Sequence, residues 1–544
     1  MQQKHFIKKA FILFLITSLI TSIATIFVAC GEKSSKPNIK ERDELVIAVG
    51  SLFDSGQFDP KQKYGSHQQH RLTHNSLLKY DSDLNLIGDL ASDYEISKDG
   101  MSWTFTIKPD IKFSNGETVT AEDVVFTYDM LKKDGIAFDL GFIDTIQIIE
   151  NDKVKFNLKE PRITFVSQLT EIPIVPAKYY DENYTNNPIG SGPYMVKEYK
   201  KGEQVIFEKN PYYSKPLFFK KLTFLLLEED AALAAAKAGG IDVLAIPASF
   251  SEQKIDNMTL YSYPSVDARG IVLPVLPAGN KGMINGTEVN VGNDVTSDLA
   301  IRQALNIGLN RKELIDLTMN GYGQVSYSLS DRLPWFNEEQ IIEDGNIEEA
   351  KRILSDAGWK DEDGDGILEK NGIKASFELY YSAEDKLRGD LSVGVADQAI
   401  KFGIEIKPRG SSWDEIFRNG KENAVLWAGG RHHPHQLYTM YSSKVIDTGY
   451  NNMSQYKNKL VDEYLDKAMT SSDIEKSYQY WKLAQWDNNA KNGFAGIGDA
   501  PIVWITQIDH LYFLANDLDV GKQILHSHGY EWSLFNDIDT WKLK

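Results

Sequence analysis

Residues 89–129 decide the fold of this chain, and they read DLASDYEISKDGMSWTFTIKPDIKFSNGETVTAEDVVFTYD. Within them, the run WTFTI at 103–107 alternates apolar and polar side chains, which predicts a half-buried β-strand. Thr120 and Asp123 have the spacing of a helix capping box, with Asp in the place of the usual Glu or Gln. The apolar stripe that follows them predicts a helix. A strand and a helix in one short segment predict a mixed α/β protein.

The same two patterns recur outside this segment. The run VKFNL at 154–158 alternates as a strand does. Asn346 is placed to cap a second helix, with Glu349 three residues later and Gly358 at its end. The run PIGSGP at 188–193 is too rich in Gly and Pro for a helix, and no Lys-Ser or Lys-Thr follows it. We therefore interpret it as a turn between domains and not as a phosphate-binding loop.

Length and composition restrict the possible functions. With 544 residues, of which 42% are hydrophobic, the chain can bury two or three cores, and wholesale disorder is excluded. The net charge of -18 argues against nucleic acid as the partner, because a polyanion would be repelled. The single cysteine, Cys30, excludes an internal disulfide, a thiolate cluster and a cysteine nucleophile in the folded body.

The start of the chain has the pattern of an export signal. Residues 1–9 carry three lysines and no acid, and residues 10–29 carry no charge. Cys30 follows a small residue, as in a bacterial lipobox, although Phe27 stands where Leu is usual. We predict that residues 1–29 are a signal peptide, that Cys30 is lipidated, and that residues 30–43 are a tether. The alternative is an uncleaved membrane anchor, and in both cases the body lies outside the cytoplasm.

One loop has the beginning of a calcium-binding EF-hand. Asp361, Asp363 and Asp365 are followed by Gly366, but the twelfth position, which should be Glu, is Gly372. No helix signal follows promptly, so we interpret the loop as a solvated Asp/Gly turn.

Four ordered segments resemble one protein family. They are the opening segment at 89–129 and three others at 186–213, 298–316 and 350–372. In this order they are similar to the peptide/nickel-binding family, family 5, of extracellular solute-binding proteins, which serve ABC importers. The resemblance covers essentially all of residues 44–544 and does not specify the cargo.

The resemblance implies an α/β, two-lobe fold of the periplasmic-binding-protein type (type II) that closes on a ligand, with an extra domain inserted in lobe one. Carried onto this chain, it predicts lobe one at 44–272 with the inserted domain at about 81–190, lobe two at 273–504, and a return to lobe one at 505–544. The two crossings between the lobes are expected near 271–275 and 501–510, which are apolar and contain proline.

Histidine is the most informative residue type for a site. Eight histidines fall into three groups, at 67–74, 432–435 and 526–528, and His510 stands alone in the mature chain. Three separated groups that converge in one cleft would suit nickel, copper or zinc, which imidazole binds well. Pro434 favours an extended backbone at the preceding His433. If these segments are extended, His433 and His435 point the same way, as do His526 and His528.

We predict metal binding for five histidines: His67, His433, His435, His526 and His528. His74 lies among leucines, and we expect it to be packed inside the lobe. Arg431 could hold a ligand carboxylate in two-point fashion, with a surface arginine as the alternative. The predicted ligand-binding residues beside the metal ligands are Tyr64, Trp427, Arg431, His432 and Tyr438. Trp427 and Tyr438 could instead simply pack the lobe.

Three functions are candidates for this chain. The first is a substrate-binding lipoprotein, a monomer on the periplasmic or cell-surface side, that delivers nickel to an ABC permease and its ATPase. The nickel would be bound as a chelate with a small molecule such as histidine, and nickel would be the transported ligand and not a catalytic cofactor. The second is a short-peptide binder of the same family. The third, a metal-dependent hydrolase, lacks support because no H-E-x-x-H or G-x-S-x-G motif occurs.

Overall fold

The computed structural model describes residues 42–50, 58–61, 70–134, 138, 140–528 and 532–544. Residues 44–544 form one compact unit. Cys30, Tyr64 and His67 lie outside the described residues. None of the described helices has the length and apolar character that crossing a membrane requires.

Lobe one is built on a seven-stranded sheet in the order β12-β23-β11-β1-β10-β9-β8. β1 pairs in parallel with β10 and β11, while β9 and β23 run antiparallel to their neighbours. Buried side chains cover both faces, which is why β1 reads as a continuous apolar run. The strands and the helix α5 span Glu44–Ala48 (β1), Tyr194–Lys200 (β8), Gln204–Lys209 (β9), Lys221–Leu225 (β10), Glu229–Lys237 (α5), Val243–Ile246 (β11), Met258–Tyr263 (β12) and His510–Ala515 (β23).

Lobe two is built on a six-stranded sheet in the order β16-β22-β13-β21-β19-β20. Its strands are Ala268–Val272 (β13), Gly323–Val325 (β16), Ser376–Ser382 (β19), Glu405–Ser411 (β20), Ala424–Gly429 (β21) and Ile502–Ile508 (β22). One set of helices shares a core with the sheet: Leu299–Gly308 (α6), Arg311–Met319 (α7), Ile347–Asp356 (α8) and Lys386–Ala399 (α9). Buried residues of the other set pack in a second core with strand residues of the same sheet: Trp413–Asn419 (α10), His435–Tyr441 (α11), Lys459–Met469 (α12) and Ile474–Gln485 (α13).

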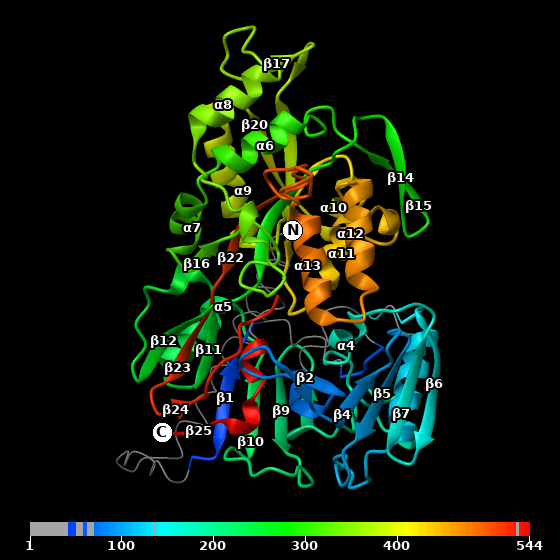
Figure 1. Cartoon of the computed structure of the whole chain (residues 1–544). Helices are drawn as coiled ribbons and strands as arrows, with labels where there is room; N and C mark the ends of the chain where they lie inside the picture. Colours follow the sequence, from blue (N-terminus) through cyan, green and yellow to red (C-terminus); the bar gives the residue numbers. More distant parts are fainter. Residues whose placement is uncertain (1–41, 51–57, 62–69, 135–137, 139, 529–531) are drawn as a thin grey trace, which may run out of the picture. The chain divides into compact units, whose positions relative to one another are not determined.

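The inserted domain is a four-stranded antiparallel sheet, β4-β5-β7-β6, with the helix α3 packed on it (Figure 1). Its elements are Ala91–Ile96 (β4), Ser102–Ile107 (β5), Ala121–Asp134 (α3), Ile143–Glu150 (β6), Lys153–Leu158 (β7) and Phe165–Gln168 (α4). The predicted strands at 103–107 and 154–158 are confirmed as β5 and β7. The predicted cap is confirmed too, because the backbone N–H of Thr120 donates to the Asp123 carboxylate at 2.8 Å.

The remaining elements are short. They comprise the helix His70–Thr73 (α2) and the hairpins Leu78–Tyr80 (β2) with Leu86–Gly88 (β3), Asn280–Ile284 (β14) with Thr287–Val291 (β15), and Glu369–Lys370 (β17) with Ile373–Lys374 (β18), and the pair Leu518–Asp519 (β24) with Lys542–Leu543 (β25).

The chain crosses from lobe one to lobe two between Tyr263 and Ala268, earlier than the expected 271–275. The expected position was wrong because residues 268–272 form a central strand that is buried on both faces. In the sequence, an apolar run looks the same whether it is a crossing or a core strand. The return crossing, between Ile508 and His510, lies inside the expected 501–510. The two crossings are hydrogen-bonded to each other, since the N–H of Ile508 donates to the carbonyl of Asp267 at 2.9 Å.

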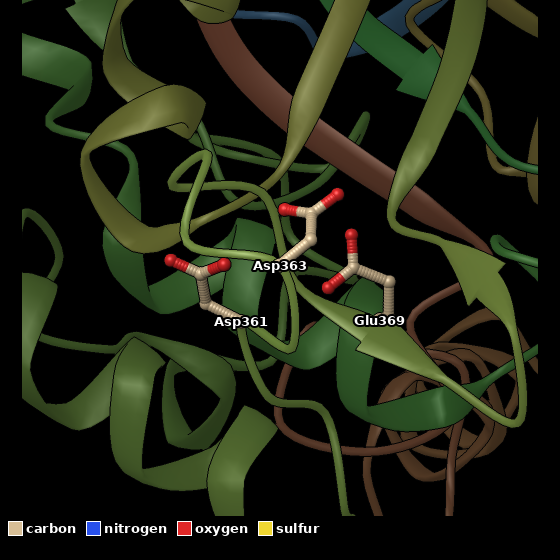
Figure 2. A group of neighbouring side chains, drawn as sticks. All are labelled: Asp361, Asp363 and Glu369. Atoms are coloured by element: carbon tan, nitrogen blue, oxygen red, sulfur yellow. The ribbon is translucent and has the colours of Figure 1, made fainter.

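The acidic loop after α8 is a turn, as predicted, and it leads into the β17–β18 hairpin and not into a helix. Carboxylate oxygens of Asp361, Asp363 and Glu369 lie within 4.8 Å of one another, and Figure 2 shows the three side chains around the loop. The Lys374 ammonium lies 3.5 Å from Asp363 and 3.6 Å from Glu369, and it also contacts Asp365. A lysine therefore already neutralises part of this charge.

Candidate ligand site between the two lobes

A cavity of about 90 Å³ lies where lobe one, lobe two and the C-terminal segment meet. Lobe one contributes α2, the end of β2 and the residues that follow α4, and lobe two contributes the loop between β21 and α11. The acidic and basic side chains in the lining are His70, Arg71, Glu171, Arg431, His432 and His433. Among the described lining residues there are two guanidinium groups and a single carboxylate, a balance that favours carboxylate groups on a ligand.

Arg431 and His433 of lobe two face Glu171 of lobe one. A guanidinium nitrogen of Arg431 lies 3.5 Å from the Oε1 atom of Glu171, and the Nε2 atom of His433 lies 3.6 Å from the same oxygen. The three side chains are between 10% and 28% exposed. The predicted carboxylate-binding arginine therefore does face a carboxylate, but the carboxylate belongs to the protein.

The neighbouring His432 joins the loop of lobe two to the C-terminal segment. Its Nε2 atom donates to the carbonyl oxygen of Leu525 at 2.6 Å, and its ring packs edge-on against Tyr80 of lobe one at 5.6 Å. Burial lowers the pKa of His432 to about 4, an effect that the hydrogen bond to Leu525 only partly offsets. At neutral pH this imidazole is uncharged, the form that a metal ion requires.

Arg71 is held in place by lobe one alone. Its guanidinium donates to Asp89 at 2.8 Å and to the carbonyl oxygen of Thr170 at 2.9 Å. Asp89 in turn accepts hydrogen bonds from the side chain of Asn75 and the backbone of Ser76. Such a network fixes the position of the guanidinium before a ligand arrives.

The structure describes two histidines of the first group, His70 and His74. His74 is fully buried, accepts a hydrogen bond from Thr73 and donates one to Tyr184, so the prediction that it packs inside the lobe is confirmed. Burial lowers the pKa of His74 to about 3. His70, which the sequence analysis did not single out, lines the cavity, and its Nε2 atom lies 3.1 Å from the hydroxyl of Ser76.

His435 does not continue an extended chain from His433. Pro434 has helical backbone angles and caps α11, which begins at His435, so the expectation of two parallel side chains on an extended segment is wrong. Proline fixes its own φ at a value that suits a helix start, and this outweighed its effect on the residue before it. The imidazole of His435 stacks on Tyr438 with 6.3 Å between ring centres, and burial lowers its pKa to about 3.

Trp427 and Tyr438 lie away from the cavity lining. The ring of Trp427 contacts Trp413 at 6.0 Å and Phe417 at 6.4 Å in the core of lobe two. Tyr438 lines a second space of about 300 Å³, together with Arg162 and Asp466. The alternative that these two aromatic residues pack the lobe fits their positions.

The last histidine group meets a buried carboxylate at the crossings. The Nδ1 atom of His528 donates to Asp267 at 2.7 Å, and the Nε2 atom of His510 lies 3.5 Å from the same carboxylate. His526 stacks on Tyr263, and its Nδ1 atom lies 3.0 Å from that of His510. His510 and His528 therefore meet at Asp267, His526 reaches this group only through His510, and none of the three lines the cavity.

The environment of Asp267 keeps it charged. Burial by itself would raise its pKa, but the guanidinium of Arg269 and the imidazole of His528 hold the pKa well below its usual range. Burial also lowers the pKa of His526 and His528. The result is a buried ionic cluster that contacts both crossings and the C-terminal segment.

The described residues around the cavity do not bring three metal-binding side chains together, so they do not form a site for a bare metal ion. Among the residues that the structure describes, only Asp361, Asp363 and Glu369 form a group of three donors within 4.8 Å. Histidine spacing in the sequence indicated which histidines are neighbours, but not that Glu171 and His70 share the cavity. Glu171 follows a segment with no motif, so nothing in the sequence marked it.

Comparison with known proteins identifies the relatives of this chain. Residues 85–448 match the sequence profile of the bacterial extracellular solute-binding proteins, family 5 (middle). Protein XP55 of Streptomyces lividans is 33% identical over 496 residues, which cover 88% of this chain and 86% of that protein. The oligopeptide-binding protein AppA of Bacillus subtilis is 28% identical over 510 residues (86% and 90%), and the nickel-binding periplasmic protein of Escherichia coli is 26% identical over 423 residues (72% and 77%).

Two solved structures have the same fold. NikZ from Campylobacter jejuni, in complex with Ni(L-His), has a TM-score of 0.76 at 24% identity, and AppA from Bacillus subtilis, in complex with a nonapeptide, has a TM-score of 0.70 at 24% identity. Each alignment covers 92% of this chain and 99% of the other. The predicted two-lobe α/β fold is confirmed. The relatives are solute-binding transport proteins and not enzymes, so the hydrolase hypothesis is set aside.

Proposed function

Because this chain belongs to the bacterial extracellular solute-binding proteins of family 5, whose members work with ABC permease and ATPase components, we propose that it captures nickel as a small-molecule chelate. The chelator carries carboxylate and imidazole groups, as histidine does. The observation that carries the proposal is the lining of the 90 Å³ cavity by two arginines and three histidines from both lobes. Closure of the lobes on the ligand then has a physical cause, because a ligand favours the state in which it makes more contacts.

The donor set supports a chelate better than a bare ion. Arg431 is the group that can take a carboxylate of the chelator, with Arg71 across the cavity as a second cation. His433 and His70 are the imidazoles in the cavity that can complete the coordination of nickel. The chelator supplies the remaining donors, which the described protein residues do not bring together. We also propose that His67 is a nickel ligand, as the sequence analysis predicts.

A short peptide is the second candidate. It is favoured by the 28% identity to the oligopeptide-binding protein AppA over most of both chains. A peptide also ends in a carboxylate, which Arg431 would bind. The volume of about 90 Å³ is the space of only a few water molecules, so both cargos need a wider site than this one, and the nickel–histidine complex, as the smaller cargo, needs less opening. A peptide would need a more open arrangement of the lobes than the one described.

The proposal includes how the protein is held at the cell surface. Lipidation of Cys30 would anchor the body through residues 30–43 on the outer side of the membrane. A lipid anchor with more than one acyl chain would keep the binding protein close to its permease, where its effective concentration is high. We further propose that the protein acts as a monomer.

Calorimetry separates the two cargos. The parent protein should bind nickel in the presence of free histidine at least tenfold more tightly than nickel alone, and it should not bind peptides when EDTA is present. Arg431→Ala and His433→Ala should each weaken the binding of nickel–histidine at least tenfold, about 1.4 kcal/mol. Arg418→Ala, an exposed arginine of lobe two, is the matched control and should leave binding unchanged. Binding of peptides in EDTA, without binding of nickel–histidine, would replace the nickel proposal by the peptide one.

A further inference from the structure

The carboxylate of Glu171 takes a position that a ligand would be expected to take. It comes from lobe one, and its Oε1 atom lies 3.5 Å from Arg431 and 3.6 Å from His433, both in lobe two. Among the described residues that line the cavity, it is the only one with a carboxylate. This contact therefore joins the two lobes directly.

The main chain holds Glu171 at this place. Its backbone N–H donates to the carbonyl of Gln168 at 3.0 Å, in the turn that ends α4. The preceding residue, Thr170, accepts the hydrogen bond from Arg71, which Asp89 fixes on the other side. The side chain therefore extends into the cavity from a fixed base, and the ion pair with Arg431 needs little reordering of lobe one.

The charge of Glu171 has two consequences for a ligand. A carboxylate that approaches Arg431 must displace Glu171 or suffer repulsion from it, because like charges a few ångströms apart repel. A cationic group, such as a metal ion or an ammonium, can instead join Glu171 and be attracted. The pair is 12% to 28% exposed, so the attraction exceeds that of a surface ion pair but is still reduced by water.

We propose that Glu171 is a built-in substitute for the ligand, which holds the empty lobes together through Arg431 and makes the site select ligands that combine a carboxylate with a cation. The selectivity half of this inference rests on the proposed function, while the closure half does not. A nickel–histidine complex satisfies both partners, since its carboxylate can take Arg431 and its metal lies near Glu171. A ligand with carboxylates alone satisfies only Arg431 and leaves Glu171 opposed.

Solution scattering of the ligand-free protein tests the closure half. The parent should have a smaller radius of gyration at low salt than in 1 M NaCl, because salt screens a partly exposed pair. Glu171→Ala and Arg431→Ala should each give the larger radius already at low salt, with a shift in the open-to-closed ratio of about fivefold. The double variant should open no further than either single one, because both remove the same pair. Glu182→Gln, an exposed acid of the same domain, is the control.

Calorimetry with citrate, a ligand with carboxylates and no cation, tests the selectivity half. Glu171→Ala should bind citrate at least threefold more tightly than the parent and nickel–histidine at least threefold more weakly. An unchanged radius in both single variants overturns the closure half, whatever the cargo is. Citrate binding that is unchanged, weaker or absent in Glu171→Ala overturns the selectivity half. A parent that binds no nickel–histidine refutes the proposed function and leaves the scattering result to stand by itself.

Discussion

Replacing Asp267 by Asn should destabilise the whole body of the protein. The Asp267 side chain is 2% exposed and contacts the guanidinium of Arg269, whose own side chain is also 2% exposed. His528 donates to the same carboxylate at 2.7 Å, and His510 lies 3.5 Å from it. Asn keeps the shape and one acceptor oxygen but has no charge, so Arg269 loses its counter-ion in the interior.

The size of the effect follows from this burial. Removal of one partner from a buried ion pair costs about 3–5 kcal/mol, because the other charge remains in a medium that solvates it poorly. The amide oxygen of Asn still accepts a hydrogen bond, so we expect about 3 kcal/mol, the lower end of that range. The Asp267 carboxylate contacts residues on both crossings, and the loss should therefore affect both lobes.

The pH dependence gives a second, independent expectation. The pKa of Asp267 is well below its usual range in the folded protein, so the unfolded chain binds the proton more readily. The stabilisation is therefore present above the unfolded value of about 3.9 and is lost as the pH falls below it. The difference in stability between parent and Asp267→Asn should be largest near pH 7 and should shrink in acid.

Urea denaturation followed by circular dichroism measures both effects. Asp316→Asn is the control, because Asp316 pairs with Lys312 on the exposed surface of α7, where such a pair contributes less than about 0.5 kcal/mol. A loss below about 1 kcal/mol at pH 7, on the same scale as this surface pair, would refute the view that the cluster is a buried ionic one. The same loss at pH 7 and in acid would refute the depressed pKa.

Three further predictions concern other parts of the chain. Burial lowers the pKa of His74 and His435 to about 3, so below pH 6.5 the unfolded chain takes up protons that the folded protein does not. Each histidine should therefore lower the free energy of unfolding by about 1.4 kcal/mol per pH unit below about 6.5. The urea midpoint should be lower at pH 5 than at pH 7, and His74→Gln should reduce the difference. In Gly190→Ala the new methyl would meet a backbone oxygen at 2.0 Å, whereas in Gly240→Ala the nearest atom is 3.4 Å away, so thermal denaturation should show a loss of about 1–3 kcal/mol for the first only. Cys30→Ala should leave the exported body in the soluble fraction, or unprocessed, and a correctly cleaved variant that still partitions into membranes would contradict lipidation.

Local chemistry is what the sequence determined by itself. The alternation at 103–107 forms β5, the Thr120–Asp123 pair begins α3, and Asn346 accepts a hydrogen bond from Glu349 at the start of α8. The acidic loop is a turn for a local reason too, since its aspartates bond to backbone N–H groups within five residues. Each of these features depends on residues a few positions apart, so their order in the chain is enough to predict them.

Only the tertiary structure decided which side chains meet. His528 and Asp267 are 261 positions apart, and no periodicity joins them. Glu171 faces Arg431 because the inserted domain and lobe two approach each other. His528 meets Asp267, and His526 meets His510, because β12, β13 and β23 bring the crossings together. Packing between distant segments selects one arrangement of the chain from many with the same local pattern, and the composition of the cavity is a property of that arrangement alone.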